Sequence, residues 1–208
     1  MFAPLLIHRF FVNIRYEKGG KINGFKIGVS GSAVDNCTKD APRKAELVGY
    51  HLARKGMVVV TGETTGMPYY AAKGAKKGNG FTVGISPAIS YVEHVRKYRL
   101  PHKYTDFVMY TGFGYSGRNL LFIRSTDAVI FICGRIGTLN EFTIAFEDKK
   151  PIGILLETGG VIDEIDHILT VSQRGRNNIV FDSDPKKLVE KLIALVQKEA
   201  REKAKRNK

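Results

Sequence analysis

Short runs of apolar, largely β-branched residues recur along the chain, and helical segments separate them. The clearest runs are Met57–Thr61 and Ala128–Cys133, in which almost every residue is apolar. A strand without polar alternation must be covered on both faces, which is typical of a parallel sheet packed between helices. Strands are expected at residues 25–30, 57–61, 81–85, 106–110, 128–133, 151–156 and 178–181. The sequence therefore predicts an open, mostly parallel sheet of about seven strands.

Helix signals fill the intervals between these strands. Asp40 is expected to cap a helix that ends near Gly56, and Ser116 is expected to cap another that ends near Arg124. Further helices are expected at residues 67–77, 139–147 and 162–169 and from residue 184 onward, whereas residues 87–104 are expected to be irregular. This order predicts one Rossmann-like three-layer α/β/α domain over residues 25–197, with an N-terminal extension of residues 1–24 and a basic tail of residues 198–208.

The chain is strongly basic. Its 208 residues include 33 Lys and Arg against 20 Asp and Glu, for a net charge of +13, and six basic residues stand between positions 198 and 208. This charge favours anionic partners, but it does not distinguish nucleic acid from small phosphorylated ligands. With 43% hydrophobic residues the chain has the apolar content of an ordinary core, so disordered and fibrous classes are excluded.

Neither the cysteines nor the histidines form a recognisable metal or disulfide pattern. Cys37 and Cys133 stand 96 positions apart without a CxxC motif, and the five His are scattered. We therefore expect no metal site, no disulfide, a buried Cys133 that acts as a small hydrophobic residue, and a reducing cytoplasmic location. No run of about 18 uncharged apolar residues occurs, so no membrane span is expected, and the apolar segment 1–7 lacks the features of a signal peptide.

Four loops that follow expected strands carry the candidate chemistry. In open parallel sheets, ligands bind beyond the carboxyl ends of the strands. The loops at residues 31–33, 61–66, 111–117 and 134–138 are rich in glycine and hydroxyl residues, which let backbone N–H groups approach a phosphate. The expected phosphate- or ligand-binding residues in these loops are Gly31, Ser32, Gly62, Gly66, Gly134, Arg135, Gly137 and Thr138.

The segment from Gly134 to Glu141 is the sharpest of these signals. It joins a buried strand directly to a helix start, so that free N–H groups and the positive end of the helix dipole face the crevice. Glu141 is expected to project into the same space. A structural alternative is that Thr138 caps the helix and Glu141 completes a capping box, and the two interpretations are compatible.

One arginine and one basic segment each have two interpretations. Arg118 is either a fork for a phosphate or carboxylate, or a solvated residue in the first turn of a helix. The basic, Tyr-rich segment that contains Arg96 and Arg99 is either a lid or a surface on which bases stack. GxGxxG, GxxxxGK[ST] and GxSxG motifs do not occur, so NAD binding by the usual route, Walker-type ATP hydrolysis and a hydrolase triad have no support.

The order of these motifs resembles the LOG-like family, the group long mislabelled as lysine decarboxylases, and especially its molybdenum-cofactor carrier-like branch. The resemblance covers about residues 26–195. Its landmarks are Gly31-Ser32, the strand and glycine loop 58–66, the Ala- and Lys-rich segment 71–78 before a strand ending at Pro87, Gly117-Arg-Asn119, Asp127–Ile130, Gly137–Glu141 and Lys150–Ile152. These seven landmarks in order predict the LOG-like fold.

The resemblance implies a nucleotide-like phosphorylated small molecule as the partner. Members that activate cytokinins cleave the N-glycosidic bond of nucleoside 5′-monophosphates with an Arg and a Glu, which correspond here to Arg118 and Glu141, and Asn119 joins the ligand site. The alternatives are a non-catalytic carrier or sensor of a molybdopterin-type cofactor or signalling nucleotide, and a basic nucleic-acid-binding protein. No cofactor requirement is evident, and a homodimer or homotetramer is expected.

The sequence departs from the enzymes of the family at two motifs. Their PGGxGTxxE motif has Cys133 and Arg135 here, in place of the proline and the second glycine, and their GGGxxG motif has Thr61 and Glu63 in place of glycines. Glu63 is expected to repel a nearby phosphate, whereas Arg135 is expected to attract one. The identity of the ligand is therefore not carried over from the family.

Overall fold

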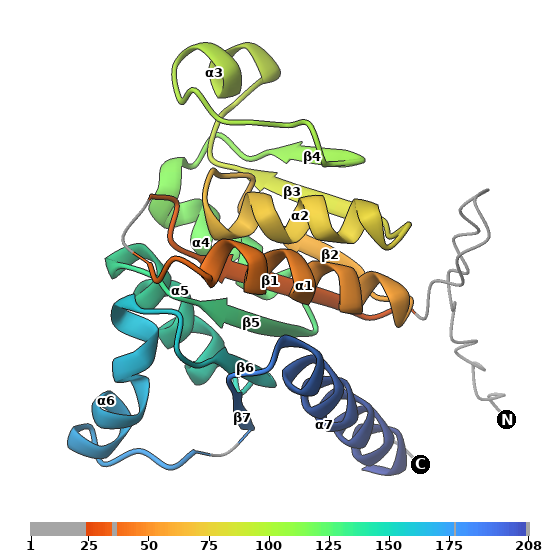
Figure 1. Cartoon of the computed structure of the whole chain (residues 1–208), viewed down its shortest axis with the longest axis vertical. Helices are drawn as coiled ribbons and strands as arrows, with labels where there is room; N and C mark the ends of the chain where they lie inside the picture. Colours follow the sequence, from red (N-terminus) through yellow and green to blue (C-terminus); the bar gives the residue numbers. More distant parts are fainter. Residues whose placement is uncertain (1–23, 35–36, 177, 207–208) are drawn as a thin grey trace, which may run out of the picture.

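The sheet consists of seven parallel strands. The computed structural model describes residues 24–34, 37–176 and 178–206, and in these residues the strand order is β4-β3-β2-β1-β5-β6-β7 (Figure 1). The strands are β1 (Lys26–Gly31), β2 (Val58–Thr61), β3 (Thr82–Ser86), β4 (Phe107–Tyr110), β5 (Ala128–Ile132), β6 (Ile152–Leu155) and β7 (Ile179–Asp182). The predicted Rossmann-like α/β fold is confirmed.

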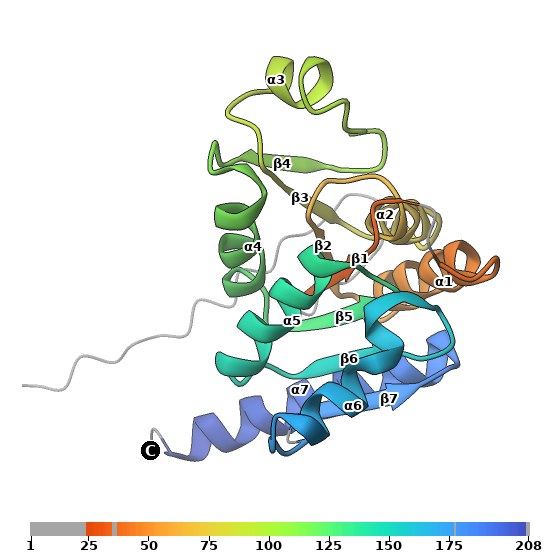
Figure 2. The same cartoon turned by 90° about the vertical axis from the view of Figure 1, so that its left-hand side faces the viewer.

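Helices cover both faces of this sheet. They are α1 (Ala41–Arg54), α2 (Met67–Lys77), α3 (Tyr91–Arg96), α4 (Gly114–Arg124), α5 (Ile136–Glu147), the 3₁₀ helix η1 (Gly160–Glu164), α6 (Ile165–Val171) and α7 (Pro185–Arg206). Helices α1, α2 and α7 pack on one face, and α4, α5 and α6 pack on the other (Figure 2). None of the helices in the described part of the chain is long and apolar enough to cross a membrane.

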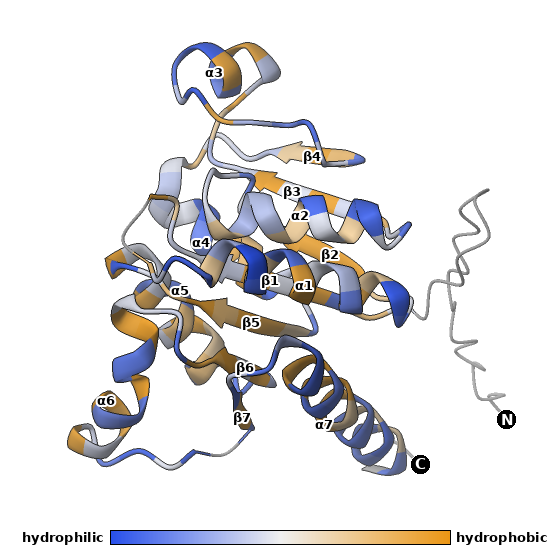
Figure 3. Ribbon diagram, in the orientation of Figure 1, coloured by the Kyte–Doolittle hydropathy of each residue, from blue (hydrophilic) through white to orange (hydrophobic). Residues whose placement is uncertain are grey.

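The central strands carry the core. In β5, Ile130 faces the α1 and α7 side while Val129 and Phe131 face the α4 and α5 side, and all three are fully buried. Burial on both faces explains why this run shows no polar alternation. Figure 3 shows β2 and β5 as hydrophobic elements, whereas α7 carries many hydrophilic residues.

The strand order places a crevice above β1, that is, beyond the carboxyl end of this strand. The chain winds from β1 outward to β4, and then returns to the other side of β1 as β5. The loops that leave β1 and β5 therefore turn toward opposite faces of the sheet, and the space between them is where open α/β sheets bind ligands. Of the four predicted loops, the two that follow β1 and β5 therefore lie at the centre of the predicted site.

Several predicted helix boundaries were wrong. Residues 87–104 contain the short helix α3, whose cap Ser90 accepts a hydrogen bond from the backbone N–H of Glu93. Helix α4 begins at Gly114, so Ser116 lies inside it and is not its cap. Helix α5 begins three residues before the predicted start at residue 139. Helix α7 continues to Arg206, so most of the predicted basic tail is part of the final helix, while residues 1–23 of the predicted extension lie outside the described residues.

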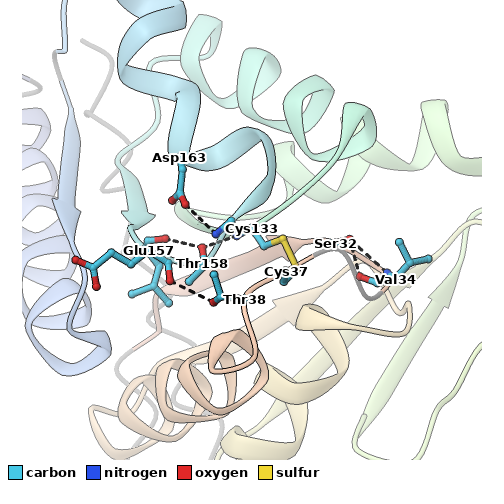
Figure 4. Close-up of a disulfide and its surroundings, with 10 residues drawn as sticks. Ser32, Val34, Cys37, Thr38, Cys133, Glu157, Thr158 and Asp163 are labelled. Atoms are coloured by element: carbon cyan, nitrogen blue, oxygen red, sulfur yellow. Dashed lines mark hydrogen bonds between the residues drawn. A yellow bond between two sulfur atoms is a disulfide. The ribbon is translucent and has the colours of Figure 1, made fainter.

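Cys37 and Cys133 form a disulfide, so the expectation of two free thiols was wrong (Figure 4). Their Cα atoms are 5.8 Å apart although 96 positions separate them in the sequence. The pairing of β1 with β5 brings together the loops that contain them. The predicted cytoplasmic location, which depended on unpaired cysteines, loses that support and stays a prediction.

Thr158, which follows β6, connects the same two loops. Its hydroxyl accepts a hydrogen bond from the N–H of Cys133 at 2.8 Å (Figure 4). Its carbonyl accepts one from the N–H of Thr38 at 3.0 Å. The disulfide is thus one of several links that hold the β1, β5 and β6 loops together.

Reduction of the disulfide is expected to lower the free energy of unfolding by about 2 to 4 kcal/mol, because the covalent link closes a long loop in the unfolded chain. Urea denaturation with and without a thiol reductant measures this. The Cys37→Ala/Cys133→Ala variant is the control, and its stability should not respond to the reductant. An unchanged midpoint in the fully reduced parent protein would contradict a stabilising role.

Candidate functional site

A cavity of about 260 Å³ opens at the crevice above β1. It is lined by Gly31, Ser32, Ala33, Thr64, Tyr115, Arg118, Asn119, Arg135, Ile136, Gly137, Thr138 and Glu141. Eight of the residues singled out from the sequence are among them: Gly31, Ser32, Arg118, Asn119, Arg135, Gly137, Thr138 and Glu141. The structure thus brings most of the predicted site residues together around one cavity.

Arg118 and Glu141 form a buried ion pair at this cavity. The guanidinium Nη1 of Arg118 donates to Oε1 of Glu141 at 2.7 Å, and the two residues are only 5% and 6% exposed. The hydroxyl of Ser30 donates to the second carboxylate oxygen of Glu141. The interpretation of Arg118 as a solvated surface residue is therefore wrong.

Burial and charge act in opposite directions on Glu141. Burial raises the pKa of its carboxyl, while the Arg118 charge and the hydrogen bonds from Ser30 and Arg118 act to lower it. A buried carboxylate is stable only when it is paired, and each oxygen of Glu141 has a donor. Glu141 therefore belongs to a closed network that joins β1, α4 and α5.

A glycine in the β2 loop makes room for Arg118. A Cβ atom on Gly62 would lie 2.2 Å from Nη1 of Arg118, so any side chain at position 62 would displace the guanidinium. Gly62 itself does not line the cavity, and its placement explains why this position needs glycine. The Nε atom of Arg118 is buried and has no hydrogen-bond partner among the described residues.

The N-terminus of α5 forms another wall of the cavity. The helix starts at Ile136, so the N–H groups of Ile136, Gly137 and Thr138 precede the first helical hydrogen bond, which Leu139 donates to Arg135. These N–H groups and the helix dipole create a positive potential at the cavity. Arg135 adds an exposed guanidinium beside them.

The capping-box interpretation of this segment was wrong. No side chain caps α5, whose cap position is Arg135, and Glu141 lies in the second turn, where it bonds to Ser30 and Arg118. Gly134, which does not line the cavity, has a φ of +119°, and a Cβ there would overlap the side chain of Thr138. Its role is to let the chain turn from β5 into the helix.

Gly66 lets the β2 loop pack closely against the β1 loop beside the cavity. It has a φ of +71°, and a Cβ there would lie 2.1 Å from the carbonyl oxygen of Ser32. The β2 loop can therefore approach the β1 loop only with glycine at this position. Like Gly62, Gly66 lies beside the cavity residues and is not among them.

Glu63 does not line the cavity. The prediction that its carboxylate repels a phosphate there was wrong, because its side chain points away from the cavity. Its side chain packs over Gly84 of β3, is 2% exposed, and accepts a hydrogen bond from the hydroxyl of Thr105 at 2.8 Å. Its second oxygen has no partner among the described residues. Burial raises the pKa of Glu63 to about 7.

Four residues of the cavity lining and one residue of the buried network were not among the predicted site residues. Ala33, Thr64, Tyr115 and Ile136 all belong to the four predicted loops. The side chains of Ala33 and Ile136 carry no polar signal, whereas the hydroxyls of Thr64 and Tyr115 were available signals. Ser30, which donates to Glu141 but does not line the cavity, was assigned only to a strand. Its place as the last inward-facing hydroxyl before Gly31 was the available signal for its contact with Glu141.

The basic segment that contains Arg96 and Arg99 lies far from the basic residues between positions 198 and 206. Helix α3 stands at one end of the molecule and the carboxyl end of α7 at the other (Figure 1). The two segments therefore do not lie side by side. The described residues contain no group of three or more His, Cys, Asp or Glu side chains that could hold a metal ion.

Removing either member of the buried ion pair is expected to destabilise the protein. Arg118→Met or Glu141→Leu leaves an unpaired buried charge and should lower the free energy of unfolding by about 3 to 5 kcal/mol. The double variant should lose less than either single variant, because it buries no charge. Urea denaturation gives all three values.

The exposed pair between Arg124 and Asp148 is the matched control. Arg124→Met should cost less than about 1 kcal/mol, since exposed pairs contribute little. Additive losses from Arg118→Met and Glu141→Leu would show that the two residues are not coupled.

The raised pKa of Glu63 predicts a pH dependence of stability. The folded state holds the proton up to about pH 7, whereas the unfolded chain releases it near the ordinary value of 4.5, so stability should fall as the pH rises from 4.5 to 7 and then level off. The full difference is about 3 kcal/mol. Glu63→Gln should remove this slope in urea denaturation series, and the exposed control Glu164→Gln should retain it. A slope that is identical in Glu63→Gln would contradict the buried placement.

One family of known proteins matches most of the chain. The SLOG cluster4 family matches residues 24–189. An uncharacterized protein of Archaeoglobus fulgidus is 34% identical over 130 residues, which are 62% of this chain and 79% of that protein.

Solved structures share the fold over most of their length. The molybdenum cofactor binding protein of Rippkaea orientalis has 28% identity and a TM-score of 0.68, over 82% of this chain and 96% of that one. The molybdenum cofactor carrier protein of Chlamydomonas reinhardtii has 23% identity and a TM-score of 0.66, over 83% and 98%, and this likeness shows the fold alone. These findings confirm the resemblance drawn from the seven sequence landmarks, and the chain belongs to the SLOG cluster4 family, within the LOG-like proteins.

Proposed function

We propose that the protein binds a phosphorylated, nucleotide-type small molecule in the cavity above β1. The observation that carries this proposal is the N-terminus of α5, whose N–H groups line the cavity beside the exposed Arg135. An anion at this position gains from the helix dipole, from backbone donors and from a guanidinium at once.

The buried ion pair explains why the phosphate would bind at α5. Arg118 is already neutralised by Glu141, so its charge is not free for a ligand. Arg135 pairs with no carboxylate among the described residues, and it is exposed in the lining of the cavity. The phosphate is therefore placed against Gly137 and Thr138, with Arg135 as its cation and Arg118 as a neighbour.

Retention of the ligand without turnover is the form of this function that the geometry supports best. Both oxygens of Glu141 accept hydrogen bonds from protein groups, so the carboxylate is not free to act on a sugar or a water. The similarity to a molybdenum cofactor binding protein at 28% identity also favours a carrier or sensor.

Hydrolysis of the N-glycosidic bond of a nucleoside 5′-monophosphate is the second candidate. Arg118 and Glu141 line the cavity at the positions of the catalytic pair that the family resemblance implies. For cleavage, Glu141 would have to exchange its bond to Ser30 for one to the attacking water, while the carboxylate charge stabilises the positive sugar in the transition state.

The test combines binding with turnover. Calorimetry with AMP should give a dissociation constant that rises about 5- to 150-fold in Arg135→Ala, equivalent to about 1 to 3 kcal/mol for a charge-assisted contact. Arg201→Ala, an exposed charge on α7, is the control and should not change it. Equal affinities in all three proteins would contradict the proposed site.

Chromatography of the same mixtures measures release of free base. We expect none from the parent protein. Base release by the parent protein that disappears in Glu141→Gln would replace the carrier proposal with the hydrolase.

A further inference from the structure

Tyr115 is the one aromatic side chain among the described residues that line the cavity. It lies in the first turn of α4 and is 49% exposed, so a large part of its ring has no protein contact. The residues beside it in the cavity wall are polar or small, apart from Ile136, which is 78% exposed. The cavity therefore presents two apolar surfaces next to the anion-binding end of α5.

The ring of Tyr115 is held in place by two neighbours. The ring of Tyr98, from the segment after α3, contacts it edge to face, with the centroids 5.6 Å apart and the planes at 85°. The guanidinium carbon of Arg118 lies 5.9 Å from the centroid of the same ring. Since Arg118 is itself locked by Glu141, the buried network also limits the movement of Tyr115.

A half-exposed aromatic ring that its neighbours immobilise is a suitable stacking surface. A flat heterocycle that stacks on it removes apolar area from water, and the ring loses little conformational freedom because it is already positioned. Stacking of this kind does not select one base, because every planar heterocycle has a π face.

We propose that Tyr115 is the platform on which the planar heteroaromatic ring of the ligand stacks, while its phosphate binds at the N-terminus of α5. Tyr98 is then a positioning residue for this platform. The ligand class is a phosphorylated compound with a planar heterocycle, either a nucleobase or a pterin. This inference rests on the proposed function and adds the part of the ligand that the phosphate site does not recognise.

The test compares AMP with ribose 5-phosphate, which has the same phosphate and sugar but no ring. In the parent protein AMP should bind more tightly than ribose 5-phosphate, by about 10-fold or more. Tyr115→Ala should remove this difference by weakening AMP alone, and Tyr115→Phe should retain it. Tyr91→Ala is the matched control, because Tyr91 is 50% exposed and lies outside the cavity lining.

Tyrosine emission gives a second measurement that does not depend on truncating the residue. The chain has nine Tyr and no Trp, so tyrosine fluorescence is observable. AMP should quench this emission and ribose 5-phosphate should not, and Tyr115→Phe should reduce the quenching while AMP affinity is kept. Tyr98→Ala should weaken AMP alone, and Tyr98→Phe should restore it.

The outcomes separate the two proposals. If ribose 5-phosphate and AMP bind equally well, or if Tyr115→Ala weakens both to the same extent, the stacking inference is wrong and the phosphate site stands. If neither compound binds to the parent protein, the proposed function fails and the stacking inference fails with it.

Discussion

The buried ion pair between Arg118 and Glu141 determines how the rest of the site is arranged. Two charges that are almost fully removed from water are tolerated only because each has its partner, and Ser30 completes the bonding of the carboxylate. The three residues come from α4, α5 and β1, so one network sets the positions of two helices and of the strand beneath them. The glycine at position 62 and the ring of Tyr115 both contact the guanidinium and depend on where it lies.

This network also determines which groups give the cavity its positive potential. The pair is neutral as a unit, and the positive potential at the cavity comes from the free N–H groups at the start of α5 and from Arg135. A phosphate is thus attracted to one wall, while Tyr115 offers an apolar surface on another. In the proposed function, Arg135, which replaces a glycine of the family's enzymes, supplies a cation for the phosphate, and the closed bonding of Glu141 favours retention over turnover.

The fold could be predicted because parallel strands that are buried on both faces leave a strong local pattern. The same reasoning identified the loops that surround the cavity. It failed where the outcome depends on neighbours distant in sequence. The link between Cys37 and Cys133 exists because β1 pairs with β5. Glu141 was considered for a capping box because its spacing from Thr138 fits one, but the earlier start of α5 turns it toward Ser30. The direction of Glu63 depends on the space above Gly84, which no local pattern records.

The central claim is that the N-terminus of α5 receives the phosphate of a small ligand. The most direct measurement is a titration of the ¹⁵N-labelled protein with AMP, followed by the amide resonances of Ile136, Gly137 and Thr138. We expect these resonances to shift first and saturably, together with those of Ser32 and Asn119 at the same cavity. Binding that leaves the α5 resonances unchanged, or shifts confined to α3 or to the carboxyl end of α7, would contradict it.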